Sequence, residues 1–266
     1  PVMLVHGFTG VKETWERFDN YLSARKYSTY RGEYYALDES IPAQSRLLKT
    51  HIQEKKSKYQ NNDIKIQKVN VVAHSMGGLI SRFYIEEAAY YSNDVFKLIM
   101  VGTPNHGVSL GKYFLGRIGS GGKHKIAGIQ LFQHSDFLMK LNSLEDKGKH
   151  INPDVQYGNI YSYDVKLLAG DAVVAAASAY LDGVENKRFE HYTHSSELPI
   201  PGYTSITADE VIYKQILKWL NRDLKFTPLN TTEIMVTYLE DKVDIWALGF
   251  DNGEEIENRV VSIDQS

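Results

Sequence analysis

The sequence contains no cysteine, and no apolar run in it approaches the length of a membrane-spanning helix. Without cysteine the chain cannot form disulfides, thiolate metal sites or a cysteine nucleophile, although this does not decide its compartment. An excess of positive charge is also missing, because 30 basic residues stand against 33 acidic ones and the net charge is −3. The chain therefore has no basic field that would attract nucleic acid or an anionic membrane.

The composition is that of a folded domain. The 266 residues are 42% hydrophobic and 24% charged, and a chain of this length suits one α/β domain. It begins at Pro1, directly before the apolar run Val2 to Val5. We therefore expect a trimmed or processed product, with any signal peptide outside the given sequence.

The segment from Val69 to Ile80 joins an apolar, β-branched run to helical spacing. The run predicts a buried strand, and apolar residues at 76, 79, 80, 83 and 84 predict one face of a helix. Ser75 stands between them, with Ala73 and Gly77 two positions away on either side. A serine with small neighbours in a strand–turn–helix junction is typical of a nucleophile elbow. The alternative is an ordinary turn that happens to contain serine.

Strand and helix patterns alternate along the first 225 residues. Strands are expected at 2–5, 31–37, 69–72, 96–101, 159–163 and 186–192. Helices are expected at 13–25, at 43–59, from residue 76, and after the capping box Thr207-Ala208-Asp209-Glu210. This alternation predicts an α/β fold, with a mostly parallel central sheet and helices on both faces.

Residues 107–157 interrupt the alternation. The first half is rich in glycine, and the second half has Phe137, Leu138 and Leu141 on one helical face, with Ser135 as the expected N-cap. Two interpretations remain open, a cap or lid over an active site, or a surface excursion with its own small packing cluster.

The tail after residue 225 has a different pattern. Three strands are expected at 232–239, 243–250 and 259–263, with Asn252-Gly253 as a hairpin turn. We therefore divide the chain into an α/β domain at 1–225 and a C-terminal β extension, or the start of a small β module, at 226–266.

A flexible loop, His6-Gly7-Phe8-Thr9-Gly10, follows the first strand. The carboxyl edge of a parallel sheet is where ligands of α/β proteins bind. A loop of this kind supplies one backbone N–H of an oxyanion hole, and the residue after the nucleophile supplies the second. By position these donors are Phe8 and Met76. We expect His6 to hold the loop in place rather than to act as a base.

A serine nucleophile needs a base, and the base needs a third group to orient it. Three aspartates follow the elbow as candidate acids, Asp164, Asp171 and Asp182. Of two candidate bases, His191 falls within a predicted strand and His194 in the loop after it, which favours His194. Ser75, Asp171 and His194 then satisfy the chain order nucleophile, acid, base.

Five segments together resemble bacterial secreted lipases and esterases of the α/β-hydrolase fold, and more distantly the GPI-inositol deacylases. They are V-H-G-F-T-G at 5–10, A-H-S-M-G-G at 73–78, G-T-P-N-H-G at 102–107, Q-L-F-Q-H-S-D-F-L-M-K-L-N at 130–142, and G-D-A-V-V-A-A-A-S-A at 170–179. Ala73 departs from the usual G-x-S-x-G pattern but matches the A-x-S-x-G elbow of Bacillus-type lipases. The likeness covers about residues 1–220 and not the tail.

The resemblance implies a serine carboxylic-ester hydrolase that acts on ester or lipid substrates through an acyl-enzyme on Ser75. It favours Asp171 as the acid, with His194 as the base and the Phe8 and Met76 N–H groups as oxyanion donors. It also implies a secreted monomer that can contact lipid at an interface. No histidines have ligand spacing, so we expect no metal and no cofactor. A polyester depolymerase and an inactive hydrolase-fold binding module are the alternatives.

Overall fold

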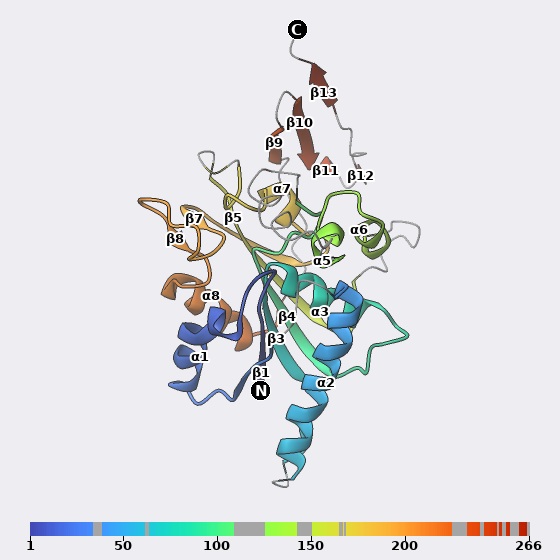
Figure 1. The fold of residues 1–266 in the computed structure, drawn as a ribbon, viewed down its shortest axis with the longest axis vertical. Coiled ribbons are helices and arrows are strands. Elements are labelled where there is room, and N and C mark those ends of the chain that lie inside the picture. The colour runs from blue at the N-terminus through green and yellow to red at the C-terminus, as the bar shows by residue number, and fades with distance from the viewer. Residues whose placement is uncertain are drawn as a thin grey trace.

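The structure is a computed structural model that describes residues 1–33, 39–61, 64–108, 126–142, 151–164, 167 and 169–224 in full. Between residues 233 and 264 it describes the backbone of five short strands. Figure 1 shows a twisted central sheet with helices on either side of it. Within the described residues, no helix combines the length and the apolar character needed to cross a bilayer.

The central sheet has six strands, and each neighbouring pair is parallel. In spatial order they are β2 (Thr29–Arg31), β1 (Val2–Val5), β3 (Val69–His74), β4 (Val95–Val101), β5 (Gln156–Ser162) and β6 (Glu185–Phe189). The predicted parallel sheet is thus confirmed. The strand expected at 31–37 was misplaced, because β2 pairs with β1 only over Thr29 to Arg31 and the next two residues, 32 and 33, are not in a strand. Residues 34–38 lie outside the described part.

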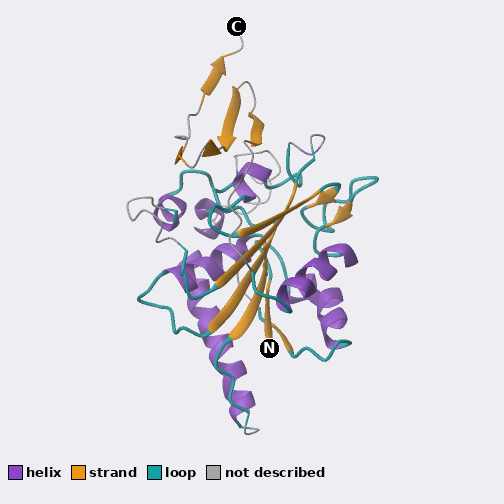
Figure 2. Cartoon of the chain, turned by 180° about the vertical axis from the view of Figure 1, so that it is seen from behind, coloured by secondary structure: helices purple, strands orange, loops and turns teal. Residues whose placement is uncertain are grey.

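Helices cover both faces of the sheet, as the sequence predicted (Figure 2). On one side, α1 (Glu16–Ser23) and α8 (Glu210–Leu220) pack on Val2 and Leu4 of β1. On the other side, α2 (Ile41–Gln60) and α3 (Met76–Glu86) pack on the alternate residues of the same strand. The two-residue period of a strand therefore divides the apolar side chains between two cores.

The start of α8 differs from the prediction. Thr207 was expected to cap the helix, but Asp209 is the N-cap, and its carboxylate accepts the N–H of Val211 at 2.6 Å. Thr207 instead accepts the hydroxyl of Tyr213 with its carbonyl and contacts the hydroxyl of Ser205. The capping-box interpretation was therefore wrong, since an aspartate one residue before the helix competes effectively for its free N–H groups.

The described part of the 107–157 segment contains α5 (Ile126–Gln130) and α6 (Asp136–Leu141). The predicted N-cap is confirmed, because the hydroxyl of Ser135 accepts the N–H of Leu138. Leu138 and Leu141 join the core on the α3 side of the sheet, and the ring of Phe137 lies 5.8 Å from that of Phe83. Residues 109–125 and 143–150 are outside the described part, so the cap remains a prediction.

The strand expected at 186–192 is divided in two. After β6 the chain turns at His191, whose φ is +63°, and continues as β7 (Tyr192–Thr193). This short strand pairs in parallel with β8 (Thr204–Ser205) instead of extending the central sheet. The turn at His191 therefore directs the chain that carries His194 away from the path of β6.

The tail contains the three predicted strands as a separate antiparallel sheet. β9 (Glu233–Leu239) pairs with β10 (Lys242–Leu248), which pairs with β13 (Val261–Asp264). Two further strands, β11 (Phe250–Asp251) and β12 (Glu254–Glu255), pair antiparallel across the predicted turn, whose residues 252–253 lie outside the described part. The division of the chain at residue 225 remains a prediction.

Candidate active site

Ser75 lies in the junction between β3 and α3, one residue before the helix begins. Its backbone has φ +54° and ψ −130°, a conformation that strains any residue with a Cβ. The Ser75 N–H donates to the carbonyl of Val101 at 3.0 Å, which ties the turn to β4. The predicted strand–turn–helix context of this serine is confirmed.

Two glycines leave room for this turn. A Cβ on Gly77 would lie 2.6 Å from the carbonyl oxygen of His6, and a Cβ on Gly7 would lie 2.6 Å from the Cβ of Ser75. Both distances are shorter than van der Waals contact, so a side chain at either position would displace backbone. The close approach of β1, its following loop and the turn therefore requires glycine.

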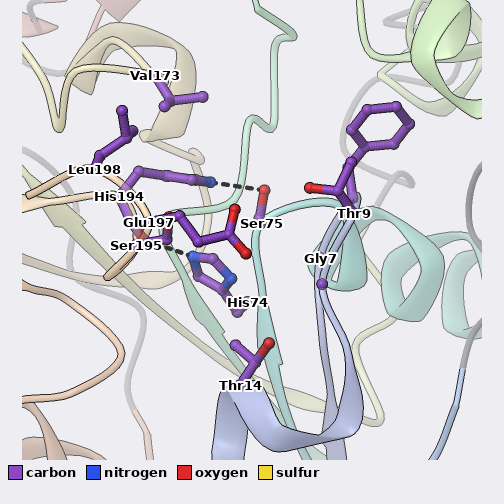
Figure 3. Close-up of a pocket in the computed structure, with 12 residues that line it drawn as sticks. Gly7, Thr9, Thr14, His74, Ser75, Val173, His194, Ser195, Glu197 and Leu198 are labelled. Carbon is purple, nitrogen blue, oxygen red and sulfur yellow. Dashed lines mark hydrogen bonds between the residues drawn. The ribbon is translucent and has the colours of Figure 1, made fainter. Parts of the chain in front are cut away.

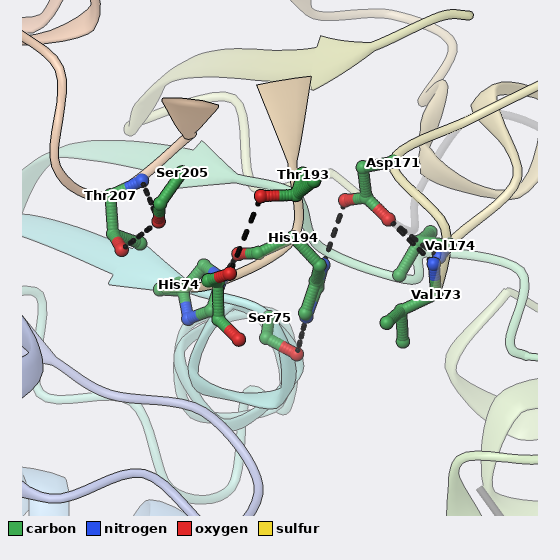
Figure 4. Close-up of polar contacts among 10 residues, drawn as sticks. His74, Ser75, Asp171, Val173, Val174, Thr193, His194, Ser205 and Thr207 are labelled. Carbon is green, nitrogen blue, oxygen red and sulfur yellow. Dashed lines mark hydrogen bonds and ion pairs between the residues drawn. The ribbon is translucent and has the colours of Figure 1, made fainter. Parts of the chain in front are cut away.

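Asp171 lies in a turn after β5 and is 1% exposed. Its Oδ1 accepts the N–H groups of Val173 at 3.0 Å and Val174 at 2.7 Å. Because both of these donors hold one oxygen, the other oxygen is directed at the neighbouring histidine. Figure 4 shows the carboxylate held between these amides and the ring of His194.

His194 connects the acid to the serine. Its Nδ1 lies 2.7 Å from Oδ2 of Asp171, and its Nε2 lies 2.8 Å from Oγ of Ser75. A carboxylate only accepts, so Nδ1 carries the proton and Nε2 is free to take one from the hydroxyl. Within this arrangement a proton can pass from the serine to the imidazole, and the resulting imidazolium faces a buried carboxylate.

The alternative acid and base lie elsewhere and contact each other. Nδ1 of His191 is 2.9 Å from Oδ2 of Asp164, and the side chain of His191 is 70% exposed. Asp182 is exposed on the chain before β6. The structure thus brings together Ser75, Asp171 and His194, and it does not bring these alternatives into contact with the serine.

Of the two residues expected to supply oxyanion donors, Met76 follows Ser75 directly and Phe8 lines the same pocket. Met76 is the first residue of α3, where backbone N–H groups have no partner inside the helix and the helix dipole is positive. Phe8 lies in the loop after β1 and lines the same pocket as the serine. Nδ1 of His6 is 3.0 Å from the carbonyl oxygen of Gly7, and burial lowers the pKa of this imidazole. His6 therefore braces the loop in its neutral form, as expected.

His74, the last residue of β3, has no role in the predictions from the sequence. Its imidazole is buried, and Nε2 lies 2.9 Å from the carbonyl oxygen of His194. Burial, followed by the nearby His194, lowers the pKa of His74 well below its ordinary value. The one sequence signal for His74 is its place in the A-H-S-M-G-G motif, because its partner, the carbonyl of His194, is 120 residues away.

The serine opens into a pocket of about 560 Å³, a volume that includes solvent at its mouth. Its described lining is Gly7, Phe8, Thr9, Gly10, Thr14, His74, Ser75, Val173, His194, Ser195, Glu197 and Leu198. Figure 3 shows the carboxylate of Glu197 among the side chains of Ser75, His194 and His74. Among the described residues, no group of three or more His, Asp or Glu side chains is placed to hold a metal ion.

Comparison with known proteins identifies one matching family model, described as a PGAP1-like alpha/beta domain, over residues 1–112. A search of curated protein sequences finds no match. Among solved structures, the mature form of lipase BlEst2 from Bacillus licheniformis is 18% identical, with a TM-score of 0.65, over 83% of this chain and 91% of that one.

Two larger proteins are similar over part of their length. Phospholipase PlaB from Legionella pneumophila is 17% identical, with a TM-score of 0.61, over 84% of this chain and 58% of that one. Lipase B from Aspergillus fumigatus is 17% identical, with a TM-score of 0.59, over 87% of this chain and 54% of that one. At these identities the likeness shows a shared fold. The chain therefore has the α/β-hydrolase fold of these lipases, and its first 112 residues match the PGAP1-like alpha/beta domain.

Proposed function

We propose that the protein is a serine carboxylic-ester hydrolase, an esterase or lipase that cleaves uncharged acyl esters. The observation that carries this proposal is the position of one imidazole. His194 lies 2.8 Å from the hydroxyl of Ser75 and 2.7 Å from the carboxylate of Asp171, in a pocket open to solvent. A hydroxyl becomes a competent nucleophile only when a base of this kind removes its proton.

The reaction has two halves. Oγ of Ser75 attacks the ester carbonyl carbon while Nε2 of His194 takes the hydroxyl proton and then gives it to the leaving alcohol. Water then attacks the acyl-enzyme while His194 again accepts a proton. The bond between the acyl carbon and Oγ of Ser75 breaks, His194 returns the proton to Oγ, and the acid is released. Asp171 keeps Nδ1 protonated and stabilises the imidazolium in both halves.

The N–H groups of Phe8 and Met76 stabilise the oxyanion of each tetrahedral intermediate. The tight turn at Ser75 supports this assignment. It places the serine directly before α3, next to the N–H of Met76 at the positive end of the helix dipole. By mutational precedent each such donor lowers the barrier by about 3 kcal/mol.

The pocket lining supports an uncharged substrate. Phe8, Val173 and Leu198 provide apolar surface for an acyl chain or an apolar alcohol. Glu197 adds a carboxylate to the described lining, and this carboxylate disfavours an anionic substrate. The same repulsion favours departure of the anionic acid product.

Hydrolysis of p-nitrophenyl esters by the purified chain and three variants tests the proposal. Ser75→Ala and His194→Ala should abolish turnover with the fold intact, whereas His191→Ala should stay near the wild-type rate. Activity retained in His194→Ala and lost in His191→Ala would show that the base is wrongly assigned. A chain that hydrolyses no ester would be an inactive hydrolase-fold binding module.

Secretion belongs to the same proposal, because the sequence resembles secreted lipases. Ester hydrolysis found in the culture medium of the source organism, and lost on deletion of this chain, is the expected result. Interfacial contact with lipid is tested by rates on esters of increasing chain length with and without an emulsion.

A further inference from the structure

The main chain of His194 is bound on both sides by residues of the site. Its N–H donates to the carbonyl of Asp171 at 2.9 Å. Its carbonyl accepts a hydrogen bond from Nε2 of His74, also at 2.9 Å. Since both polar groups of one peptide residue are fixed, the position of the Cα, and with it the origin of the imidazole, is determined by these two contacts.

The donor, His74, is itself held rigidly. It ends β3, a central strand paired on both sides, and its side chain is buried. The ring of Trp15 meets it edge-on at 6.3 Å, and the indole N–H of Trp15 donates to the carbonyl of Val5 at 2.9 Å. The central sheet thereby fixes the position of the His74 ring, and this ring fixes the main chain of His194.

The rings of His74 and His194 lie close together, with centroids 4.7 Å apart. The ring of His74 must donate to His194 while it is uncharged. His194 becomes an imidazolium during the reaction, and a second cation beside it would be repelled. The carbonyl of His194 would be left without this donor if His74 were removed, and both residues are buried.

We propose that His74 is a positioning residue, whose ring N–H holds the His194 carbonyl so that the imidazole of His194 stays aligned with the hydroxyl of Ser75. This inference rests on the proposed hydrolase function. It predicts an effect on the chemical step, because His74 acts on the base and not on the bound substrate. Misplacement of a catalytic group by about 1 Å can lower a rate by roughly 100-fold.

Three variants separate the hydrogen bond from the volume of the ring. In His74→Gln the side-chain amide reaches about as far as Nε2 and can donate in its place. His74→Asn is shorter by one CH₂ group and cannot reach. His74→Phe keeps the ring volume and has no donor.

The expected result on p-nitrophenyl esters is a kcat for His74→Gln within about threefold of wild type. We expect kcat for His74→Asn and His74→Phe to fall roughly 10- to 100-fold, with KM changed less than twofold. In proton NMR spectra, the far-downfield resonance of the Nδ1 proton of His194 should persist in His74→Gln and weaken in the other two variants. If His74→Phe does not fold, the kcat values of His74→Gln and His74→Asn alone test whether the hydrogen bond to the His194 carbonyl is needed.

Equal kcat values for the Gln and Asn variants, or a change confined to KM, would overturn the positioning role. This failure is distinct from failure of the proposed function. In that case the wild-type chain itself would hydrolyse no ester.

Discussion

Asp171 contacts His194 twice, once through its side chain and once through its main chain. Its Oδ2 is 2.7 Å from Nδ1 of the ring, and its carbonyl oxygen is 2.9 Å from the backbone nitrogen of the same residue. The acid therefore fixes the orientation of the imidazole and also the place where the loop after β7 begins. A substitution at Asp171 can consequently be designed to change the ring contact and leave the main-chain contact in place.

Asp171→Asn is such a substitution. The two amides of Val173 and Val174 require an oxygen, so the asparagine must direct its NH₂ group at Nδ1 of His194. Nδ1 then accepts, the proton moves to Nε2, and His194 cannot take the proton of Ser75. We expect kcat to fall about ten-thousandfold, by precedent for this tautomer change, with the thermal midpoint little altered.

Asp164→Asn is the matched control for that experiment. Asp164 contacts the exposed ring of His191 and not the serine, so kcat should stay within about twofold of wild type. A large loss in Asp164→Asn together with an active Asp171→Asn would contradict the assignment of the acid.

Glu197→Gln tests the preference of the pocket for uncharged substrates. Removing the carboxylate should raise kcat/KM for an anionic ester such as a hemisuccinate roughly threefold to tenfold, and leave a neutral ester of the same size unchanged. The gain should shrink in high salt, because the carboxylate is exposed and screened. Glu210→Gln, which removes an exposed acid paired with Lys214 on α8, is the control, and an equal gain there would refute the role of Glu197.

Lys97→Met tests a buried contact between the sheet and α8. The ammonium of Lys97, 2% exposed, donates to the carbonyls of Trp219 at 3.0 Å, Leu220 at 3.3 Å and Arg222 at 2.7 Å. It thus satisfies carbonyls at the negative end of the helix dipole. Its loss should lower the free energy of unfolding by about 2 to 4 kcal/mol.

Urea unfolding of Lys97→Met measures this loss. The exposed Lys214→Met should change stability by less than about 0.5 kcal/mol in the same assay. Equal effects at the two lysines would mean that the buried contacts contribute nothing net.

The buried histidines make stability depend on pH. Burial lowers the pKa of His74 well below 6.5 and also lowers that of His6. Below pH 6.5 the unfolded chain therefore binds protons that the folded chain does not, and this contribution to stability is lost as the pH falls. Burial raises the pKa of Glu86 to about 7, which acts in the opposite sense. The quantity to compare between wild type and His74→Gln is therefore the change in the free energy of unfolding with pH.

Between pH 7 and pH 5.5, the free energy of unfolding should fall less in His74→Gln than in wild type, as measured by urea unfolding at each pH. An identical pH dependence in the two proteins would show that burial of the His74 ring carries no proton linkage.

Local patterns accounted for the parts of the structure that the sequence predicted correctly. The change of apolar spacing at Ser75 marks the end of β3 and the start of α3, and small residues at 73 and 77 mark the turn. The inner strands β1, β3 and β4 were visible as short apolar runs, since both faces of the sheet are buried there. The side chains that follow parallel strands meet at one edge of the sheet, which is why a base after the last strand could be proposed for Ser75. The choice of residue 171 among three aspartates came from the resemblance of its G-D-A-V-V segment to the lipase family.

Contacts between distant segments were invisible to the same reasoning. The partners of His74 and Lys97 lie 120 or more positions away, and neither side chain belongs to a recognisable local pattern. The division of the last predicted strand was also missed, because it depends on the positive φ of His191. Histidine adopts both negative and positive φ, so its presence in the sequence does not mark a turn. The helix cap at Asp209 was misassigned since two capping residues stand within three positions of each other.

Covalent labelling with a fluorophosphonate tests whether Ser75 is an activated nucleophile. The reagent reacts with a serine hydroxyl only where a base activates it and an oxyanion is stabilised. We expect one adduct per chain, located at Ser75 by mass spectrometry and absent from Ser75→Ala and His194→Ala. An unlabelled wild-type chain, or an adduct at another serine, would contradict this expectation.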